Sequence, residues 1–230
     1  MLMRWPQLDS TMCGRFALAH VAGFWSRFAV IDRRAALEPR FNIAPSQMVP
    51  VVISQSPNEA VMMKWGLVPF WAKDVKIGNK LINARAETID TKPAFRGSLK
   101  RRRCLVPATG FYEWKRLGNG KAPYYIHLRD DSFFAFAGLY DAWSDQEGDR
   151  LLSFTIITTT PNSMMARIHD RMPAVLRRED EELWLGKGPL DPADRRRLLR
   201  PFPSRQMEAY AVSKDVNSPA IDAEELIRPI

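Results

Sequence analysis

Short apolar runs that alternate with polar residues fill the middle of this chain, and glycine, proline, asparagine or aspartate separates them. Such a pattern is typical of short β-strands joined by tight turns. Eight segments are predicted as strands: residues 48–54, 60–67, 81–88, 104–108, 111–116, 124–129, 133–140 and 151–159. Their close spacing predicts a largely antiparallel sheet that curls or closes into a barrel-like core.

Turn and capping residues predict a hairpin and several short helices. Asn119-Gly120 is a favoured tight-turn pair between two runs rich in aromatic and β-branched residues, so residues 112–127 are predicted to form a hairpin. Short helices are predicted at residues 21–30, 163–168, 179–185 and 192–199, the last beginning with Asp191-Pro192. We expect one α+β domain over residues 13–230, flanked by short helices, with residues 1–12 a loose N-terminal extension.

Composition limits the classes of protein that remain. The chain has 230 residues, of which 46% are hydrophobic and 10% aromatic, so it can bury a sizeable core. Its apolar runs are too short to span a membrane, and its opening residues do not resemble a signal peptide. We therefore expect a cytoplasmic protein without a membrane partner, associated with the nucleoid when it binds DNA.

The net charge bears on the kind of partner, and the cysteine content bears on disulfides and metal sites. The formal net charge of +8 favours a polyanionic partner without identifying one. Cys13 and Cys104 are the two cysteines, too few for a disulfide framework or a zinc cluster. The cysteines and histidines do not have metal-ligand spacing, so neither a metal nor a cofactor is predicted.

Cys13 is the first candidate for chemistry because Met12 stands directly before it. Removal of an initiator Met12 would leave Cys13 with a free α-amine beside its thiol, and such a 1,2-aminothiol condenses with an aldehyde to a thiazolidine ring. Both groups titrate close to neutral pH, and Arg15 is expected to lower the pKa of the thiol. The alternative is that Cys13 is a small buried hydrophobe.

Three further segments carry polar groups in unusual settings. If residues 81–88 are a strand, Asn83, Arg85 and Glu87 share one face, which either lines a cleft or is simply solvated. Glu113 lies inside the aromatic run GFYEW, where it is either exposed at an edge or functional; burial would raise its pKa toward neutrality. His169 belongs to the polar cluster His-Asp-Arg, which is unlike core packing.

The other histidines, the aromatic segment 65–71 and two basic runs are not assigned to catalysis. His20 and His127 are expected to be structural or surface residues. In WGLVPFW (65–71), Trp65 is expected in the core and Trp71, which follows a proline, at the surface where a base could stack on it. The basic runs 100–103 and 195–197 are interpreted as solvated faces and are not assigned to a DNA site.

Seven motifs together resemble the SRAP (SOS-response-associated peptidase) family, in consistent order from Cys13 to the C-terminus. They are CGRF (13–16), FNIAPS (41–46), WGLVPFW (65–71), NARAET (83–88), GFYEW (110–114), IHDRMP (168–173) and AVSKDVN (211–217). The sequence departs from the family pattern in the extension before Cys13 and in Ala72, where some relatives carry a second Trp.

The resemblance implies an abasic-site DNA-protein crosslinking activity on single-stranded DNA, in which the N-terminal cysteine forms a stable thiazolidine. By this resemblance Cys13 is the nucleophile, Asn83 orients its amine or the sugar, Glu113 performs acid and base steps, and His169 assists proton transfer. The residues implied to contact DNA are Arg15, Asn42, Pro45, Trp71, Arg85, Thr158 and Arg171.

Two other functions remain open at this stage. One is a cysteine-dependent peptidase or amidohydrolase that uses Cys13 and His169 as nucleophile and base, with Glu113 as the orienting group. The other is a non-catalytic module that binds single strands through its charge and aromatic residues. Because a thiazolidine needs a free amine, we expect that translation starts at Met12 or that the extension is cleaved.

Overall fold

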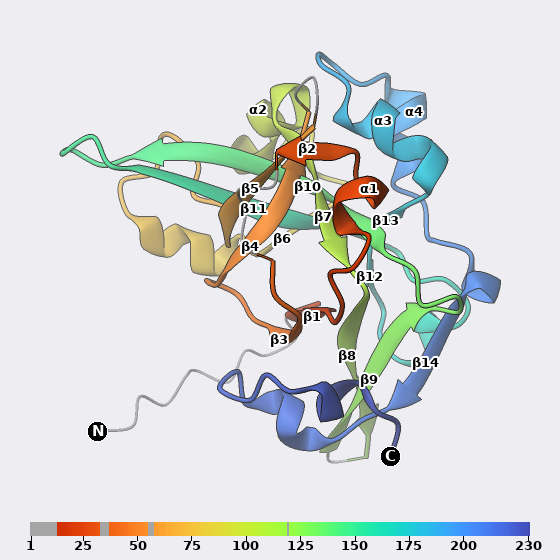
Figure 1. The fold of residues 1–230 in the computed structure, drawn as a ribbon. Helices are drawn as coiled ribbons and strands as arrows, with labels where there is room; N and C mark the ends of the chain where they lie inside the picture. The colour runs from red at the N-terminus through yellow and green to blue at the C-terminus, as the bar shows by residue number, and fades with distance from the viewer. Residues whose placement is uncertain (1–12, 33–36, 55–57, 119) are drawn as a thin grey trace.

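A computed structural model describes residues 13–32, 37–54, 58–118 and 120–230, and its chain is arranged in two β-sheets (Figure 1). The first sheet has the strand order β14-β9-β8-β1-β3, with all pairs antiparallel. Its strands are β1 (Arg15–Leu18), β3 (Arg40–Ile43), β8 (Gly110–Leu117), β9 (Gly120–Leu128) and β14 (Met207–Ala211).

The second sheet closes on itself. Its strands are β2 (Val30–Asp32), β4 (Met48–Ile53), β5 (Asn58–Trp65), β6 (Asn83–Arg85), β7 (Arg103–Ala108), β10 (Phe134–Ser144), β11 (Arg150–Thr159), β12 (Met172–Pro173) and β13 (Val175–Leu176). The series β11-β10-β7-β4-β5 ends in two strands that also pair with each other, in parallel. This closure confirms the expected barrel-like core of an α+β fold.

Aromatic side chains join the two sheets. Phe16 of β1 meets Trp65 of β5 edge to face at 5.1 Å and Phe136 of β10 at 5.9 Å between ring centroids. Phe111 of β8 packs on the same Phe136 at 5.9 Å. These rings are almost fully buried, so the apolar alternation along β1 and β8 fixes the first sheet against the barrel.

Helices are short and lie outside the barrel. They are α1 (Phe24–Arg27), α2 (Pro93–Arg101), α3 (Glu181–Leu185) and α4 (Pro192–Leu198), with 3₁₀ helices η1 (Val75–Lys80), η2 (Met165–Arg167), η3 (Arg178–Asp180), η4 (Ser204–Gln206), η5 (Lys214–Asn217) and η6 (Glu224–Ile227). The predictions at 179–185 and 192–199 are confirmed.

Two helix predictions need correction, and one helix was missed. The segment 21–30 keeps a single helical turn, because Gly23 and Ala29 on either side of it both have positive φ. The segment 163–168 is helical only in η2. The missed helix α2 buries Phe95 and Leu99, four residues apart, beneath a basic face that was interpreted as merely solvated.

The strand predictions hold with one exception. The segment 81–88 forms strand only in β6, because the chain turns after Arg85, whose carbonyl accepts a hydrogen bond from the backbone of Thr88 at 3.0 Å. The β8–β9 hairpin is confirmed, with Leu117 paired to Gly120; Asn119 lies outside the described residues. Strands β1, β2, β3, β12, β13 and β14 were not predicted.

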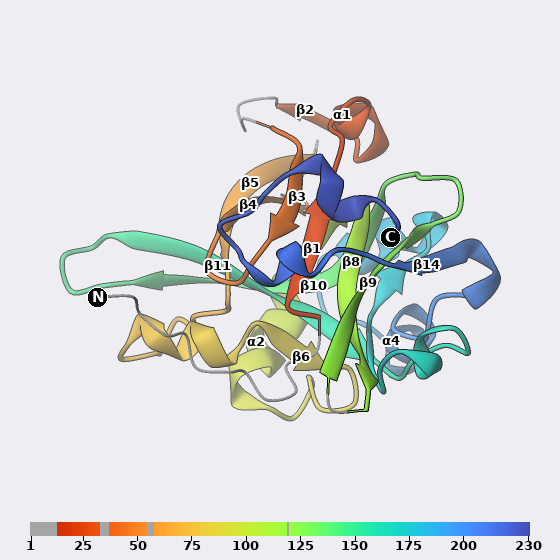
Figure 2. The ribbon, with the colours of Figure 1, turned by 90° about the horizontal axis from the view of Figure 1, so that it is seen from below.

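The end of the chain lies over the first sheet. Figure 2 shows the segment after β14 passing across β1 and β3. Within the described residues, no helix is long and apolar enough to cross a bilayer.

Candidate active site

Cys13 and Glu113 meet just before the start of β1, beside β8. Arg15 pairs with Tyr112 in the antiparallel register of these strands, so the chain that precedes Arg15 lies beside the residue that follows Tyr112. The backbone nitrogen of Cys13 donates a hydrogen bond to Oε1 of Glu113 at 2.6 Å. Cys13 is fully buried and has φ +33°, a conformation that L-residues rarely adopt. The strand pairing thus holds a nitrogen of the chain against a carboxyl group.

Glu113 is a buried acid, with only 1% of its surface exposed. Burial raises its pKa to about 8, although backbone hydrogen bonds from Cys13 and Trp114 favour the carboxylate; Asp170 adds a smaller upward contribution. The prediction that burial raises the pKa of Glu113 toward neutrality is confirmed. Near neutral pH this carboxyl can both give and take a proton.

The thiol of Cys13 behaves differently from the prediction. Burial, and secondly the nearby Glu113, raise the pKa of the Cys13 thiol well above its usual value. The expectation that Arg15 lowers this pKa is therefore wrong. The guanidinium of Arg15 instead donates to Oδ1 of Asn42 at 2.8 Å and to the carbonyl of Val216 at 2.6 Å.

Asn83 approaches Cys13 from the second sheet. β6 pairs in parallel with β11, and Asn83 of β6 lies near the start of β1. Its Nδ2 donates to the carbonyl oxygen of Cys13 at 3.4 Å. Asn83 thus holds the peptide group that follows the Cys13 α-carbon.

His169 lies beyond η2 with its side chain 19% exposed. Burial lowers its pKa, an effect that Asp170 partly opposes. Nδ1 accepts a hydrogen bond from the backbone N–H of Arg171 at 3.1 Å and also lies 3.0 Å from the exposed carboxylate of Asp170. The second contact would need a proton on Nδ1, but the backbone donor and the lowered pKa favour a neutral ring that carries its proton on Nε2.

A cavity of about 1150 Å³ lies beside these groups. Glu113 and His169 line it together with Gly14, Arg15 and Pro45. Cys13 and Asn83 are not among its lining residues; Cys13 lies behind them, held by Glu113. The predicted catalytic residues therefore gather at one site, which has the size of a small-ligand pocket.

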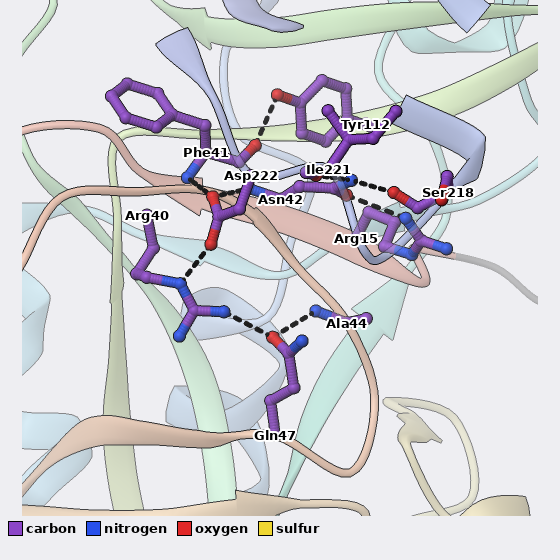
Figure 3. A network of polar contacts seen from close by, with 10 residues as sticks. All are labelled: Arg15, Arg40, Phe41, Asn42, Ala44, Gln47, Tyr112, Ser218, Ile221 and Asp222. Carbon is purple, nitrogen blue, oxygen red and sulfur yellow. Dashed lines mark hydrogen bonds and ion pairs between the residues drawn. The ribbon is translucent and has the colours of Figure 1, made fainter. Parts of the chain in front are cut away.

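Asn42, a predicted DNA contact, is buried and bonded within the protein. It is fully buried, and its Nδ2 donates to the carbonyls of Ser218 at 2.9 Å and Ile221 at 2.8 Å, while Oδ1 accepts from Arg15 (Figure 3). Both polar atoms of its side chain are thus bonded inside the protein, and the DNA contact of Asn42 stays a prediction. Its role is to fasten the C-terminal segment to β3.

Asp222 strengthens the same junction. Its Oδ1 accepts from the backbone N–H of Asn42 at 3.0 Å, and its Oδ2 pairs with Arg40 (Figure 3). Tyr112 donates its hydroxyl to the carbonyl of Phe41 at 2.6 Å from the other side. Sequence reasoning missed this network, because its partners lie up to 182 residues apart.

Thr158, another predicted DNA contact, is fully buried in β11, and its contact with DNA stays a prediction. Its carbonyl and hydroxyl oxygens accept hydrogen bonds from Nη2 of Arg171 at 2.8 and 3.3 Å. Arg171 also forms a bidentate pair with Glu87, at 2.6 and 2.9 Å, and its side chain is 11% exposed. Its guanidinium is thus occupied within the protein.

The other predicted DNA contacts lie at the surface or the cavity. Trp71 is 48% exposed beside Phe70, whereas Trp65 is buried, as expected for both tryptophans. Arg85 is exposed at the end of β6, and Pro45 lines the cavity.

Sequence reasoning missed four cations that line the cavity. They are Lys115, Arg116, Lys121 and Arg167. The basic run 100–103, by contrast, is not wholly a solvated face. Arg103 is 5% exposed and donates to the backbone carbonyls of Leu99 and Trp184 at 2.7 and 2.6 Å.

Within the described part of the chain, one group of acidic residues lies close enough together to hold a metal ion. Asp145, Glu147 and Asp149 bring three carboxylates together at the turn between β10 and β11. None of the three lines the cavity.

Comparisons with known proteins agree with this architecture. The family model described as SOS response associated peptidase (SRAP) matches residues 12–219. Abasic site processing protein YoqW of Bacillus subtilis (strain 168) is 46% identical over 227 residues, which cover 94% of this chain and 99% of that protein. Abasic site processing protein HMCES of Gallus gallus is 32% identical over 86% of this chain and 68% of its own.

A solved structure is also similar to this chain over almost its whole length. The crystal structure of a protein from Bacteroides thetaiotaomicron superposes with a TM-score of 0.87 at 32% identity, over 95% of this chain and 100% of that one. The chain therefore belongs to the SRAP, or SOS response associated peptidase, family.

Proposed function

We propose that this protein captures abasic sites in single-stranded DNA by forming a thiazolidine between Cys13 and the ring-opened sugar. Two findings support handling of abasic sites: the names of the relatives and the charge of the chain. The single observation that carries the chemistry is the 2.6 Å contact between the nitrogen of Cys13 and Glu113 at the wall of the cavity.

The proposal requires that Cys13 be the first residue of the working protein. An internal cysteine has its nitrogen in a peptide bond and cannot form an imine. The match to the family model begins at residue 12, directly before Cys13, and this supports a working form without the extension. We call this the Cys13-first form.

The reaction begins with opening of the sugar. Glu113 takes a proton from the α-ammonium of Cys13, which frees the amine, and donates it to the ring oxygen as the hydroxyl on C1′ loses its own proton, which yields the aldehyde; burial raises the pKa of Glu113 and so suits this transfer. The neutral amine of Cys13 attacks C1′, and loss of one water gives an imine. The sulfur then adds to C1′ while its proton passes to the imine nitrogen. The net change is aldehyde plus aminothiol to thiazolidine plus water.

The buried environment suits this sequence of steps. Because the thiol pKa is raised, the thiol stays protonated until the imine forms, and its proton is then available to the nitrogen. Capture by sulfur removes the imine, which would otherwise promote β-elimination and strand cleavage. Asn83 keeps the Cys13 backbone in place, and His169 relays protons at the cavity wall. Arg15, Arg85, Pro45 and Trp71 contact the strand.

The raised thiol pKa also distinguishes this function from a cysteine hydrolase. Hydrolytic cysteines need a thiolate, which a nearby cation or helix terminus stabilises. Here both burial and Glu113 oppose the thiolate of Cys13. The site therefore favours attack by the amine.

The test is a crosslinking assay with abasic single-stranded DNA and no reductant. The Cys13-first form should give an adduct that survives denaturing electrophoresis, and Cys13→Ala should abolish it. Cys104→Ala is the matched control, because Cys104 is also fully buried but lies in β7 and should leave the adduct intact. A stable adduct from Cys13→Ala would refute the assignment of Cys13.

A further inference from the structure

The hairpin of β8 and β9 presents two cations to the cavity from one place. Arg116 and Lys121 are directly paired across the two antiparallel strands, so their side chains leave the same face. Both are exposed, and both line the cavity. Each also contributes to lowering the pKa of His169, which places their charges within electrostatic reach of that ring.

The pairing of Arg116 with Lys121 destabilises the hairpin unless an anion lies nearby. Like charges directly opposite on neighbouring strands destabilise a hairpin. Elsewhere arginines are neutralised by carboxylates, as in Arg171 with Glu87 and Arg195 with Asp90. Neither Arg116 nor Lys121 has an ion pair among the described residues.

Cations outnumber acidic residues along the cavity lining. Five of its twenty residues are lysine or arginine: Arg15, Lys115, Arg116, Lys121 and Arg167. Its two acidic residues are Glu113, which is largely protonated at neutral pH, and Asp170. This cavity therefore attracts an anion close to the reacting carboxyl group.

We propose that Arg116 and Lys121 bind phosphate groups of the DNA strand where it leaves the cavity, and so hold the nucleotides next to the abasic site. The proposal rests on the function proposed above and adds a binding surface that the resemblance does not supply. The hairpin continues β8 outward from Glu113, so a strand whose sugar lies at Glu113 would pass Arg116 three residues further along β8.

Salt dependence measures phosphate contacts directly. Each phosphate neutralised on single-stranded DNA contributes about 0.7 to the slope of log Kd against log salt. Loss of two contacts should lower the slope by about 1.4, so between about 50 and 200 mM salt the wild type should lose about sevenfold more affinity than the variant.

The experiment compares Arg116→Gln/Lys121→Gln with Lys187→Gln/Arg196→Gln. The control pair removes the same charge from exposed residues near α3 and α4, which lie at the top of Figure 1, whereas β8 and β9 run toward the bottom. Binding of a labelled single strand without an abasic site is followed by fluorescence anisotropy across salt concentrations. The slope of the hairpin variant should fall by about 1.4, and the control should keep the wild-type slope.

A second measurement locates the contact. Single phosphates of the strand are replaced one at a time by neutral methylphosphonate, which should weaken wild-type binding at one or two positions and leave the hairpin variant unaffected there. Equal slopes for the hairpin variant and the control, or identical methylphosphonate profiles for wild type and variant, would overturn the proposal. Crosslinking of abasic DNA at saturating protein is measured separately, so failure of Cys13 chemistry would be seen as no adduct even if the salt slopes behave as expected.

Discussion

Substitution of Glu113 by glutamine should stabilise the protein, and the gain should grow with pH. Glutamine has the same shape and can still accept the hydrogen bond from the Cys13 backbone, but it never becomes charged. Glu113 is 1% exposed, and its pKa rises from 4.5 to about 8 on folding. The folded state therefore binds this proton more tightly than the unfolded state does, so ionisation favours unfolding.

The size of the effect follows from the two pKa values. Between pH 4.5 and about 8 the unfolded chain loses the proton while the folded chain keeps it, at about 1.4 kcal/mol for each unit of pH. The stability lost by the wild type through this group is about 1 kcal/mol at pH 5, about 3 kcal/mol at pH 7 and about 5 kcal/mol at pH 9. The free energy of unfolding of Glu113→Gln should exceed that of the wild type by these amounts.

Urea denaturation of the 230-residue chain at the three pH values measures this difference. Glu181→Gln is the matched control: Glu181 is also buried, but it forms an ion pair with Arg27 at 2.6 Å, so the substitution should destabilise the protein. In the Cys13-first form the α-ammonium would lie against the Glu113 carboxylate, and the pH dependence should shrink. An identical pH dependence for wild type and Glu113→Gln would refute the argument that burial controls this carboxyl group.

Three further outcomes are expected. Asn42→Ala should lower the free energy of unfolding by about 3 kcal/mol, seen as a fall in Tm, because buried carbonyls lose their donor. The affinity of the folded variant for single-stranded DNA should stay unchanged, and weaker binding would show that Asn42 contacts DNA. Arg85→Ala should weaken binding and lower that slope by about 0.7, and an unaltered slope would exclude a phosphate contact. Gly110→Ala should cost about 3 kcal/mol or prevent folding, since its Cβ would lie 2.2 Å from the ring of Tyr125; a normal Tm would show that the ring can move away.

The local pattern of apolar and polar residues was sufficient to predict much of the secondary structure. Strands such as β4, β7 and β11 alternate or run apolar over their whole length, and turn residues mark their ends, so their periodicity is visible without a partner. Shorter elements such as β1 and β14 carry too few residues for a period to show, and only pairing with β8 and β9 makes them strands. In α2, the two buried apolar residues were hidden by the basic residues around them.

The same division applies to the site. The sequence alone marked Glu113 as unusual, because a carboxylate in an aromatic strand is either exposed at an edge or functional, and the structure shows that it is buried, which raises its pKa. It could not show that Asn42 and Thr158 are buried, or that Arg171 is held by Glu87, since these contacts join strands far apart in the chain. Only the tertiary structure decides which polar groups form hydrogen bonds inside the protein. It also decides which ones stay exposed at the cavity, as Arg116 and Lys121 do.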